Sequence, residues 1–174
     1  MPIHRRHPAI AGEWSGRELV PSRLAAEADT EVWLALPPEG SGEQMWEALN
    51  GLFVGPGIVE IRAVPALAYD VAFGDRVSIV RSAEGSPVVN GIHERGPFGT
   101  FRLWLGESVN LTSSWRSVAE KYAELGCLVD VYSEKLIAIA CPGNRAVRIR
   151  EILEAQASES ELIWEESSLS PPTD

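Results

Sequence analysis

The sequence predicts an α+β fold in which a small β-rich N-terminal segment, a curved sheet or partial barrel, is followed by a β-α-β-β-α-β ferredoxin-like plait. Two observations lead to this prediction. Residues 31–97 contain short apolar runs broken by Gly- and Pro-rich turns, which is typical of short strands. Residues 98–167 alternate between strand-like and helix-like apolar periods. At 174 residues, the chain is long enough to bury a sizeable core.

The β-rich segment, residues 31–97, has five apolar runs of strand length, at residues 32–36, 45–49, 58–61, 76–80 and 88–92. The turn sequences "LPPEGSG", "GPG", "FGD" and "EGSP" lie between them. Several short strands at close spacing favour a strongly curved sheet or a partial barrel. We expect residues 1–30 to be an irregular lead-in, and residues 168–174, "SLSPPTD", to be a frayed tail.

The plait is predicted over residues 98–167. Its first strand, "TFRLWLG", alternates apolar and polar positions, and "TSSWRSVAEKYAELG" carries one apolar helical stripe that ends at Gly126. Two apolar runs then flank "SEK" and predict a hairpin. A second helix follows in "GNRAVRIREILEAQ", and "ELIWEES" closes the order as a final strand.

The two cysteines, Cys127 and Cys141, face each other in this hairpin, at the end of the apolar side that the helices should cover. Three interpretations are open: reduced packing residues, a redox pair, or a nucleophilic Cys141. Facing strand positions hold their Cβ atoms about 4.5–5.5 Å apart, whereas a disulfide needs about 3.8 Å. This favours two reduced thiols. The helix that starts after Cys141 is the argument for a lowered thiol pKa and a reactive residue.

One polar cluster stands at the junction of the two parts. "GIHERG" contains His93, Glu94 and Arg95, and Asp75 opens a neighbouring strand in "FGDRV". A histidine, carboxylates and arginines at a domain junction could form a general-base site with an anion clamp. The alternative is a charged turn with interdomain ion pairs. The catalytic candidates are therefore His93, Glu94, Asp75 and Cys141.

A second candidate site is the plait face that the helices leave uncovered. Strand alternation places Arg102, Trp104, Asp130 and Tyr132 on this face. It must be covered by the β-rich segment, by another subunit or by a ligand. Trp, Tyr and Arg are enriched in binding hot spots, and Arg102 can hold a carboxylate bidentately. We therefore predict a binding role for these four residues together with Arg95.

Charge and missing motifs exclude several function classes. The net charge is −10, and no basic residue follows Arg150. Such a surface repels nucleic acid and anionic lipid but could attract a basic protein. The sequence has no nucleotide-binding loop, hydrolase elbow or zinc ribbon, and we expect no cofactor and no metal site. Without a membrane-length apolar run or a signal peptide, the expected location is the cytoplasm.

The sequence resembles a bacterial family catalogued as domain of unknown function forty-two sixty-five. The resemblance covers roughly residues 31–166 and is carried by Trp46, Pro65, Gly74 and Asp75 of "FGDRV", Arg102, and Cys127 after "LG". The chain departs from the family pattern before Arg102, where "ERGPFG" replaces a small-residue turn that contains a histidine; His93 is the nearest substitute. The resemblance implies no activity and no catalytic residue.

Two function classes follow. The first is a small acidic intracellular binding protein that neutralises or regulates a partner protein, as immunity proteins do. The second is a cofactor-independent enzyme, of cyclase or isomerase type, in a bacterial biosynthetic pathway, with its site between the two parts. The expected ligand is a protein partner or an acidic small molecule. Plaits support both classes, so the fold does not choose between them.

Overall fold

Two six-stranded sheets form most of the computed structural model, which describes residues 1–38, 40, 42–106 and 114–169. The strand orders are β1-β5-β4-β8-β7-β6 and β12-β9-β11-β10-β2-β3. The bounds of the strands are β1 Ile3–Arg5, β2 Gly12–Trp14, β3 Leu19–Pro21, β4 Thr30–Ala35, β5 Met45–Gly55, β6 Ile58–Ile61, β7 Arg76–Arg81, β8 Pro87–Glu94, β9 Phe98–Trp104, β10 Leu128–Val131, β11 Leu136–Pro142 and β12 Ile163–Ser168. The helices are α1 Arg23–Ala26, α2 Trp115–Glu124 and α3 Ala146–Glu159, the last preceded by a 3₁₀ turn at Gly143–Arg145. The predicted α+β class is confirmed.

The first sheet closes into a five-stranded barrel because β5 pairs both with β4 and with β6, the last strand of the order β5-β4-β8-β7-β6. Residues 46–51 of β5 pair with β4, and residues 51–55 pair with β6. β8 joins β4 to β7, and its contact with β4 is parallel. The core of this barrel consists of Val32, Leu49, Val59, Ile61, Ala63, Val71 and Val77. The curved β-rich segment predicted from residues 31–97 is therefore a barrel-like sheet.

The pairings of β5 with β4 and with β6 meet at Gly51, which is paired with both Thr30 and Ile61. A Cβ atom at Gly51 would lie 2.3 Å from Cγ1 of Val59, so a larger residue would force the two strands apart. Glycine at this position lets β6 approach closely enough to close the barrel.

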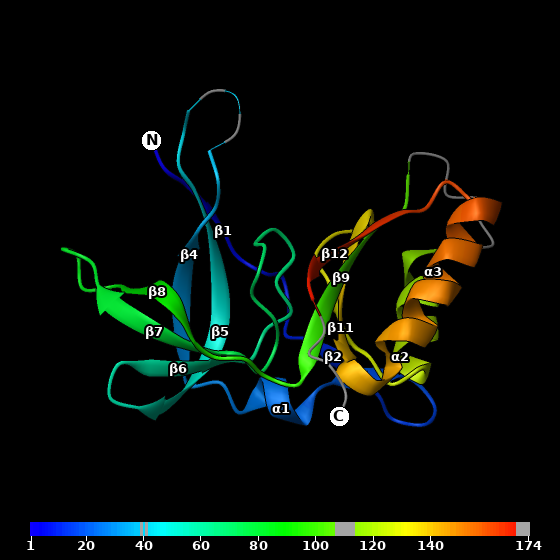
Figure 1. Ribbon diagram of the computed structural model, residues 1–174, viewed down its shortest axis with the longest axis horizontal. Coiled ribbons are helices and arrows are strands. Elements are labelled where there is room, and N and C mark those ends of the chain that lie inside the picture. Colours follow the sequence, from blue (N-terminus) through cyan, green and yellow to red (C-terminus); the bar gives the residue numbers. More distant parts are fainter. Residues whose placement is uncertain (39, 41, 107–113, 170–174) are drawn as a thin grey trace.

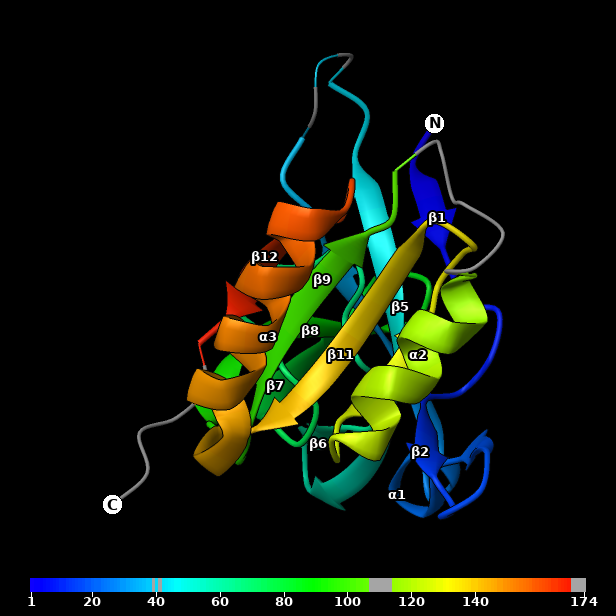
Figure 2. The same cartoon turned by 90° about the vertical axis from the view of Figure 1, so that its right-hand side faces the viewer.

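The second sheet is covered on one face by helices. β9, β10, β11 and β12 pair antiparallel in the order β12-β9-β11-β10. Figure 2 shows α2 and α3 side by side over this face, with the barrel behind the sheet. Alternate strand residues and both helices form its core: Phe101, Leu103, Leu105, Val118, Ala119, Tyr122, Ala123, Cys127, Val129, Ile137, Ile139, Cys141, Ala146, Ile149, Leu153 and Leu162. No helix within the described ranges is long and apolar enough to cross a membrane.

Residues 1–30 differ from the expected irregular lead-in, because they contribute strands to both sheets. β1 pairs parallel with β5, and β2 and β3 extend the second sheet beyond β10. Each of these strands has only three residues, which is too short for an alternating pattern to be visible in the sequence. Most of the expected tail, residues 170–174, lies outside the described residues; β12 continues to Ser168.

The segment between β6 and β7, residues 62–75, is called the central loop below. Figure 1 shows it between the barrel and the second sheet. It packs on the sheet face that the helices leave uncovered, in a cluster that also includes residues from the N-terminal segment: Ala11, Ala25, Val64, Ala66, Phe73, Leu128, Ala138 and Ala140. The uncovered face therefore has a cover within the same chain.

A buried ion cluster links the two sheets beside this loop. His7 Nδ1 lies 2.7 Å from Asp130 Oδ2 on β10, and His7 Nε2 lies 2.8 Å from Glu47 Oε1 on β5. All three side chains are almost completely buried. The carboxylate of Glu47 also accepts hydrogen bonds from the backbone N–H groups of Ala66, Leu67 and Ala68 at 2.7–3.2 Å. The cluster therefore joins the barrel, the second sheet and the central loop.

The cluster is an imidazolium between two carboxyl groups. Burial opposes the charge on His7 most strongly, but hydrogen bonds and charge attraction to Asp130 and Glu47 outweigh it and raise the pKa of His7 to about 10. Burial also raises the pKa of Asp130, against the effect of His7. The neighbouring ring of Tyr132 meets the imidazole edge to face at 5.4 Å.

We expect the protein to lose stability in alkaline solution because of His7. Its pKa rises from about 6.5 in the unfolded chain to about 10 in the folded chain, so the folded state binds the extra proton. The stabilisation is complete below pH 6.5 and is lost as the pH rises towards 10, by up to about 1.4 kcal/mol per pH unit. Urea unfolding at pH 6, 8 and 10 measures this slope. His7→Gln should unfold more easily at pH 6 and should lack the slope, and an unchanged slope in this variant would contradict the assignment.

Candidate functional site

Arg102 on β9 is the centre of the site. Its Nη1 donates to the carbonyl oxygens of Ala66 and Leu67 in the central loop, at 3.1 and 2.7 Å. Its guanidinium carbon lies 4.1 Å from the centre of the Tyr69 ring. Nη2 forms an ion pair with Glu165 Oε1 of β12 at 2.7 Å. The Tyr69 hydroxyl donates to the same carboxylate at 3.1–3.3 Å, so a hydrogen bond and an ion pair converge on Glu165.

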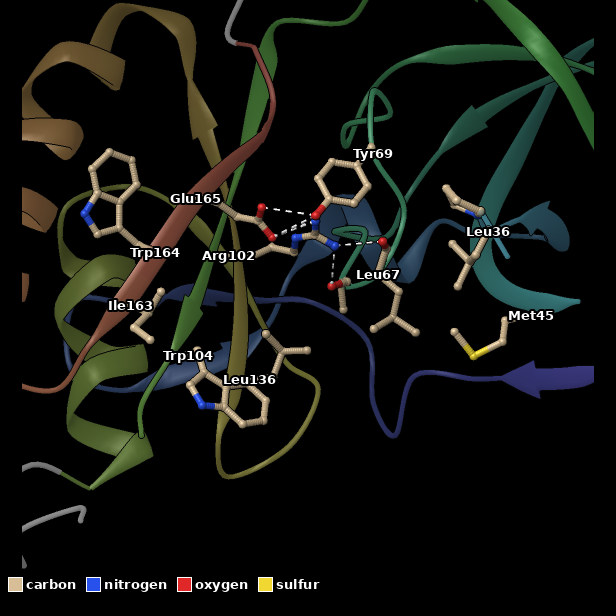
Figure 3. A pocket seen from close by; sticks show the side chains of 12 residues that line it. Leu36, Met45, Leu67, Tyr69, Arg102, Trp104, Leu136, Ile163, Trp164 and Glu165 are labelled. Atoms are coloured by element: carbon tan, nitrogen blue, oxygen red, sulfur yellow. Dashed lines mark hydrogen bonds and ion pairs between the residues drawn. The ribbon is translucent and has the colours of Figure 1, made fainter. Parts of the chain in front are cut away.

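These residues line a cleft of about 660 Å³ between the barrel and the second sheet. Figure 3 shows Arg102, Tyr69 and Glu165 at its centre, with apolar side chains on both sides. The full lining is Leu36, Pro37, Met45, Ala66, Leu67, Tyr69, Arg102, Trp104, Leu136, Ile163, Trp164 and Glu165. A mostly apolar cleft with a few polar groups is the usual form of a ligand site, and this volume lies in the usual range.

Several large side chains of the cleft are open to solvent. Trp104 is 43% exposed, Tyr69 50% and Ile163 67%. Trp104 and Arg102 were both predicted to bind a ligand, and the structure brings them together in the cleft. Arg102 itself is only 7% exposed, because Tyr69 and Glu165 lie over it.

Asp130 and Tyr132, the other predicted binding residues on this face, lie elsewhere. Asp130 is 2% exposed and belongs to the buried ion cluster with His7. Tyr132 is only partly buried, and burial is the main cause that raises its pKa. Asp130 was predicted to bind a ligand on the face away from the helices, but its carboxylate is already paired with His7, because the N-terminal segment crosses this end of the sheet.

The predicted junction cluster forms a second, smaller cavity of about 320 Å³, which is lined by Glu94 and Arg95, among others. Arg95 Nη1 lies 3.0 Å from Asp75 Oδ2, and Glu94 pairs with Arg76 at 2.8 Å. Asp75 also accepts from the backbone N–H groups of Ala72 and Gly96, so its carboxylate fixes two turns.

His93 is exposed on β8 and does not line this cavity. The general-base arrangement expected from "GIHERG" is therefore not assembled: Asp75 is 1% exposed and already holds three donors, whereas His93 lies outside the cavity. The arrangement matches the alternative interpretation of a charged turn with ion pairs.

Cys127 and Cys141 are both free and buried. A hydrogen bond with Cys141 is the main cause that raises the pKa of the Cys127 thiol, and burial adds to it. The same hydrogen bond is the main cause that lowers the pKa of Cys141, with help from Arg145 and Arg150. Cys141 is 0% exposed in the core under the helices, so a substrate cannot reach it. This location does not suit the role of nucleophile that was considered for Cys141.

The sequence interpretation missed Glu47, His7, Tyr69 and Glu165. The sequence did contain a signal for Glu47. It lies two residues from both Met45 and Leu49, so all three share the inward face of an apolar strand. A charge at such a position indicates a buried polar partner. His7, in "HRRH", carries no comparable local signal. No group of three or more potential metal ligands gathers among the residues that the structure describes.

We expect both thiols to be reduced in the native protein. Thiol titration of protein that is unfolded without reductant should find two reactive groups per chain, and titration of the folded protein should find almost none, because both are buried. Cys127→Ser is the control and should lower the count to one. No reactive thiol in unfolded, monomeric protein would instead indicate a redox pair.

Comparisons with known proteins place this arrangement in a family. Residues 44–164 match the model of a family described as "Domain of unknown function (DUF4265)". The fold is similar to a crystal structure of a hypothetical protein from Neisseria gonorrhoeae, with a TM-score of 0.66 and 14% sequence identity over 82% of this chain and 96% of that one. No curated protein matches. The match spans more than half of the sequence, from β5 to β12, and includes Arg102, Trp104 and Tyr69; the chain belongs to the DUF4265 family.

Proposed function

We propose that this chain is a small acidic intracellular binding protein that neutralises or regulates a partner protein, as immunity proteins do, and that it holds the partner at the cleft between its two sheets. The observation that carries the proposal is the set of exposed large side chains in the cleft, Tyr69, Trp104 and Ile163. Exposed apolar and aromatic groups that surround a concave surface mark interaction sites.

We further propose that residues 98–167 form a ferredoxin-like plait. The order β9-α2-β10-β11-α3-β12 and the antiparallel pairing β12-β9-β11-β10 support it. In a plait both helices cover one face of the sheet. The opposite face then carries Arg102 and Trp104 towards the cleft, which is what a binding role requires.

The charge distribution favours a protein partner over nucleic acid. The net charge is −10, and residues 151–174 contain acidic but no basic side chains. β12, which borders the cleft, belongs to this acidic region. A basic surface around the partner's binding segment would gain from long-range attraction, which mainly speeds association.

Binding is better supported than the alternative of a cofactor-independent enzyme in the same cleft. Of the catalytic candidates, Asp75 is occupied by backbone donors, Cys141 is buried under the helices, and His93 and Glu94 are exposed on the barrel strand β8. Glu165 is the one carboxylate among the described residues that line the cleft, and it is already paired with Arg102.

Site-specific photocrosslinking in the producing cells tests this proposal. A photoreactive amino acid at Ile163 should give a covalent adduct with one protein, which mass spectrometry identifies. The matched control is Val147 on α3, which is equally exposed, at 67%, but lies on the helix layer. Adducts of the same partner at both positions, or at neither, would contradict a partner site in the cleft.

The captured partner then allows a measurement of affinity. We expect Trp104→Ala to weaken binding of the purified partner by about tenfold or more, since buried tryptophan contacts dominate many interfaces. Trp104 is partly exposed at the end of β9, so the melting temperature should change little. Val147→Ala should leave the affinity unchanged. Equal affinities for Trp104→Ala and the unmodified protein would place the interface elsewhere.

A further inference from the structure

The guanidinium of Arg102 has one edge that the protein leaves unsatisfied. Its Nη1 is used by two loop carbonyls, but neither Nε nor Nη2 makes a hydrogen bond with any described residue. The 2.7 Å contact of Nη2 with Glu165 is an ion pair that lies off the hydrogen-bond direction. Because the Arg102 side chain is only 8% exposed, bulk water does not satisfy this edge either.

Two other arginines of the chain show this edge filled by a carboxylate. Arg6 directs Nε and Nη2 at Glu31, with N–O distances of 2.9–3.1 Å. Arg150 does the same with Glu166, at 2.8 Å for both bonds. In each case the two nitrogens hold both oxygens of one carboxylate, which is the strong bidentate form of this pair. The edge of Arg102 has the same donors, but among the described residues it meets only one oxygen of Glu165, in an ion pair to Nη2, so it is a carboxylate-binding fork that is only partly filled.

The groups that cover this fork can move without disturbing the core. Tyr69 and the side chain of Glu165 are each 50% exposed, and the Tyr69 hydroxyl bonds to Glu165. Rotation of both side chains towards solvent would open the fork to the cleft. Glu165 pairs with Arg102 in this structure, so a ligand carboxylate would have to compete with it.

We propose that the cleft binds the C-terminal carboxylate of the partner chain, following a large apolar last residue, and that this carboxylate displaces Glu165 from Arg102. The inference rests on the proposed binding function. The apolar lining, including Leu36, Met45 and Leu136, suits the last side chain. When a chain terminus enters the cleft, only the backbone that precedes it must fit. An internal acidic residue also brings in the backbone that follows it, so a terminus reaches a buried arginine more readily.

The experiment uses peptides in place of the unidentified partner. The probe is an equimolar mixture of hexapeptides that end in Leu, Ile, Met, Phe or Trp with free carboxylates, and the comparison is the same mixture as C-terminal amides. NMR of ¹⁵N-labelled protein follows the Nε–H resonance of Arg102 at up to millimolar peptide. We expect the free-carboxylate mixture to shift this resonance and the amides to leave it unchanged.

Variants separate the fork from a general apolar surface. Glu165→Gln removes the competing carboxylate and should tighten binding of the free-carboxylate peptides by about tenfold, because the peptide then no longer has to displace Glu165 from Arg102. Glu31→Gln, which removes a carboxylate of the same kind from the Arg6 pair on the barrel surface, should leave it unchanged. Tyr69→Phe keeps the stacked ring but releases Glu165, and should also tighten binding. Arg102→Lys keeps the charge without the fork and should abolish the preference for free carboxylates.

Each outcome decides the proposal. The proposal is overturned if free and amidated peptides bind equally well, or if Glu165→Gln does not bind at millimolar peptide. The Glu165 and Tyr69 variants allow this decision even if Arg102→Lys does not fold. Binding of 3-phenylpropanoate as tightly as the peptides would assign the fork to a small acid and overturn the chain-terminus assignment. Photocrosslinking at Ile163 without carboxylate-dependent peptide binding leaves the proposed function intact and rejects only this inference. Peptide binding without a crosslinked partner rejects the function instead.

Discussion

The buried contact of His7 with Glu47 and Asp130 is the interaction on which the arrangement of the two sheets depends. A buried charge without a partner is strongly unfavourable, and loss of one member of a buried pair typically costs about 3–5 kcal/mol. The three groups come from the N-terminal segment, the barrel and the second sheet. The observed placement of these parts satisfies all three groups together, so the cluster helps to specify this placement.

The same cluster explains how an irregular loop can lie between two sheets. Loops are normally at the surface, because their backbone groups need hydrogen-bond partners. The backbone N–H groups of residues 66–68 in the central loop donate hydrogen bonds to Glu47, and the carbonyl groups of residues 66 and 67 accept hydrogen bonds from Arg102. A negative and a positive side chain thus bind opposite sides of the same peptide units. Both are held by charge-assisted hydrogen bonds, which are stronger than neutral ones.

The position of the central loop also creates the cleft. The loop fills the space between the sheets beside Val64 and Phe73 but leaves it open near Leu67 and Tyr69. Arg102 consequently has two roles in one side chain: Nη1 fixes the loop, and the Nε–Nη2 edge faces the groups that cover the cleft. A structural role therefore accounts for only part of its donors. This distinguishes it from Asp75, whose carboxylate bonds to Ala72, Arg95 and Gly96 and is occupied by its turns.

After residue 30, the sequence by itself determined most elements and the faces of the strands, since these depend on local periodicity. The alternation in "TFRLWLG" correctly placed Leu103 under the helices and Arg102 on the other face, and the five apolar runs of residues 31–97 all became barrel strands. Tertiary structure alone decided what meets on these faces. His7 and Glu47 are 40 residues apart, and Tyr69 and Glu165 are 96 apart, so no local pattern encodes their contacts. The burial of Asp130 likewise depends on a three-residue strand and a returning N-terminal segment, whose short pairings have no period of their own. Periodicity reports which side of an element is apolar, whereas the partner of a polar side chain depends on where distant segments of the chain pack.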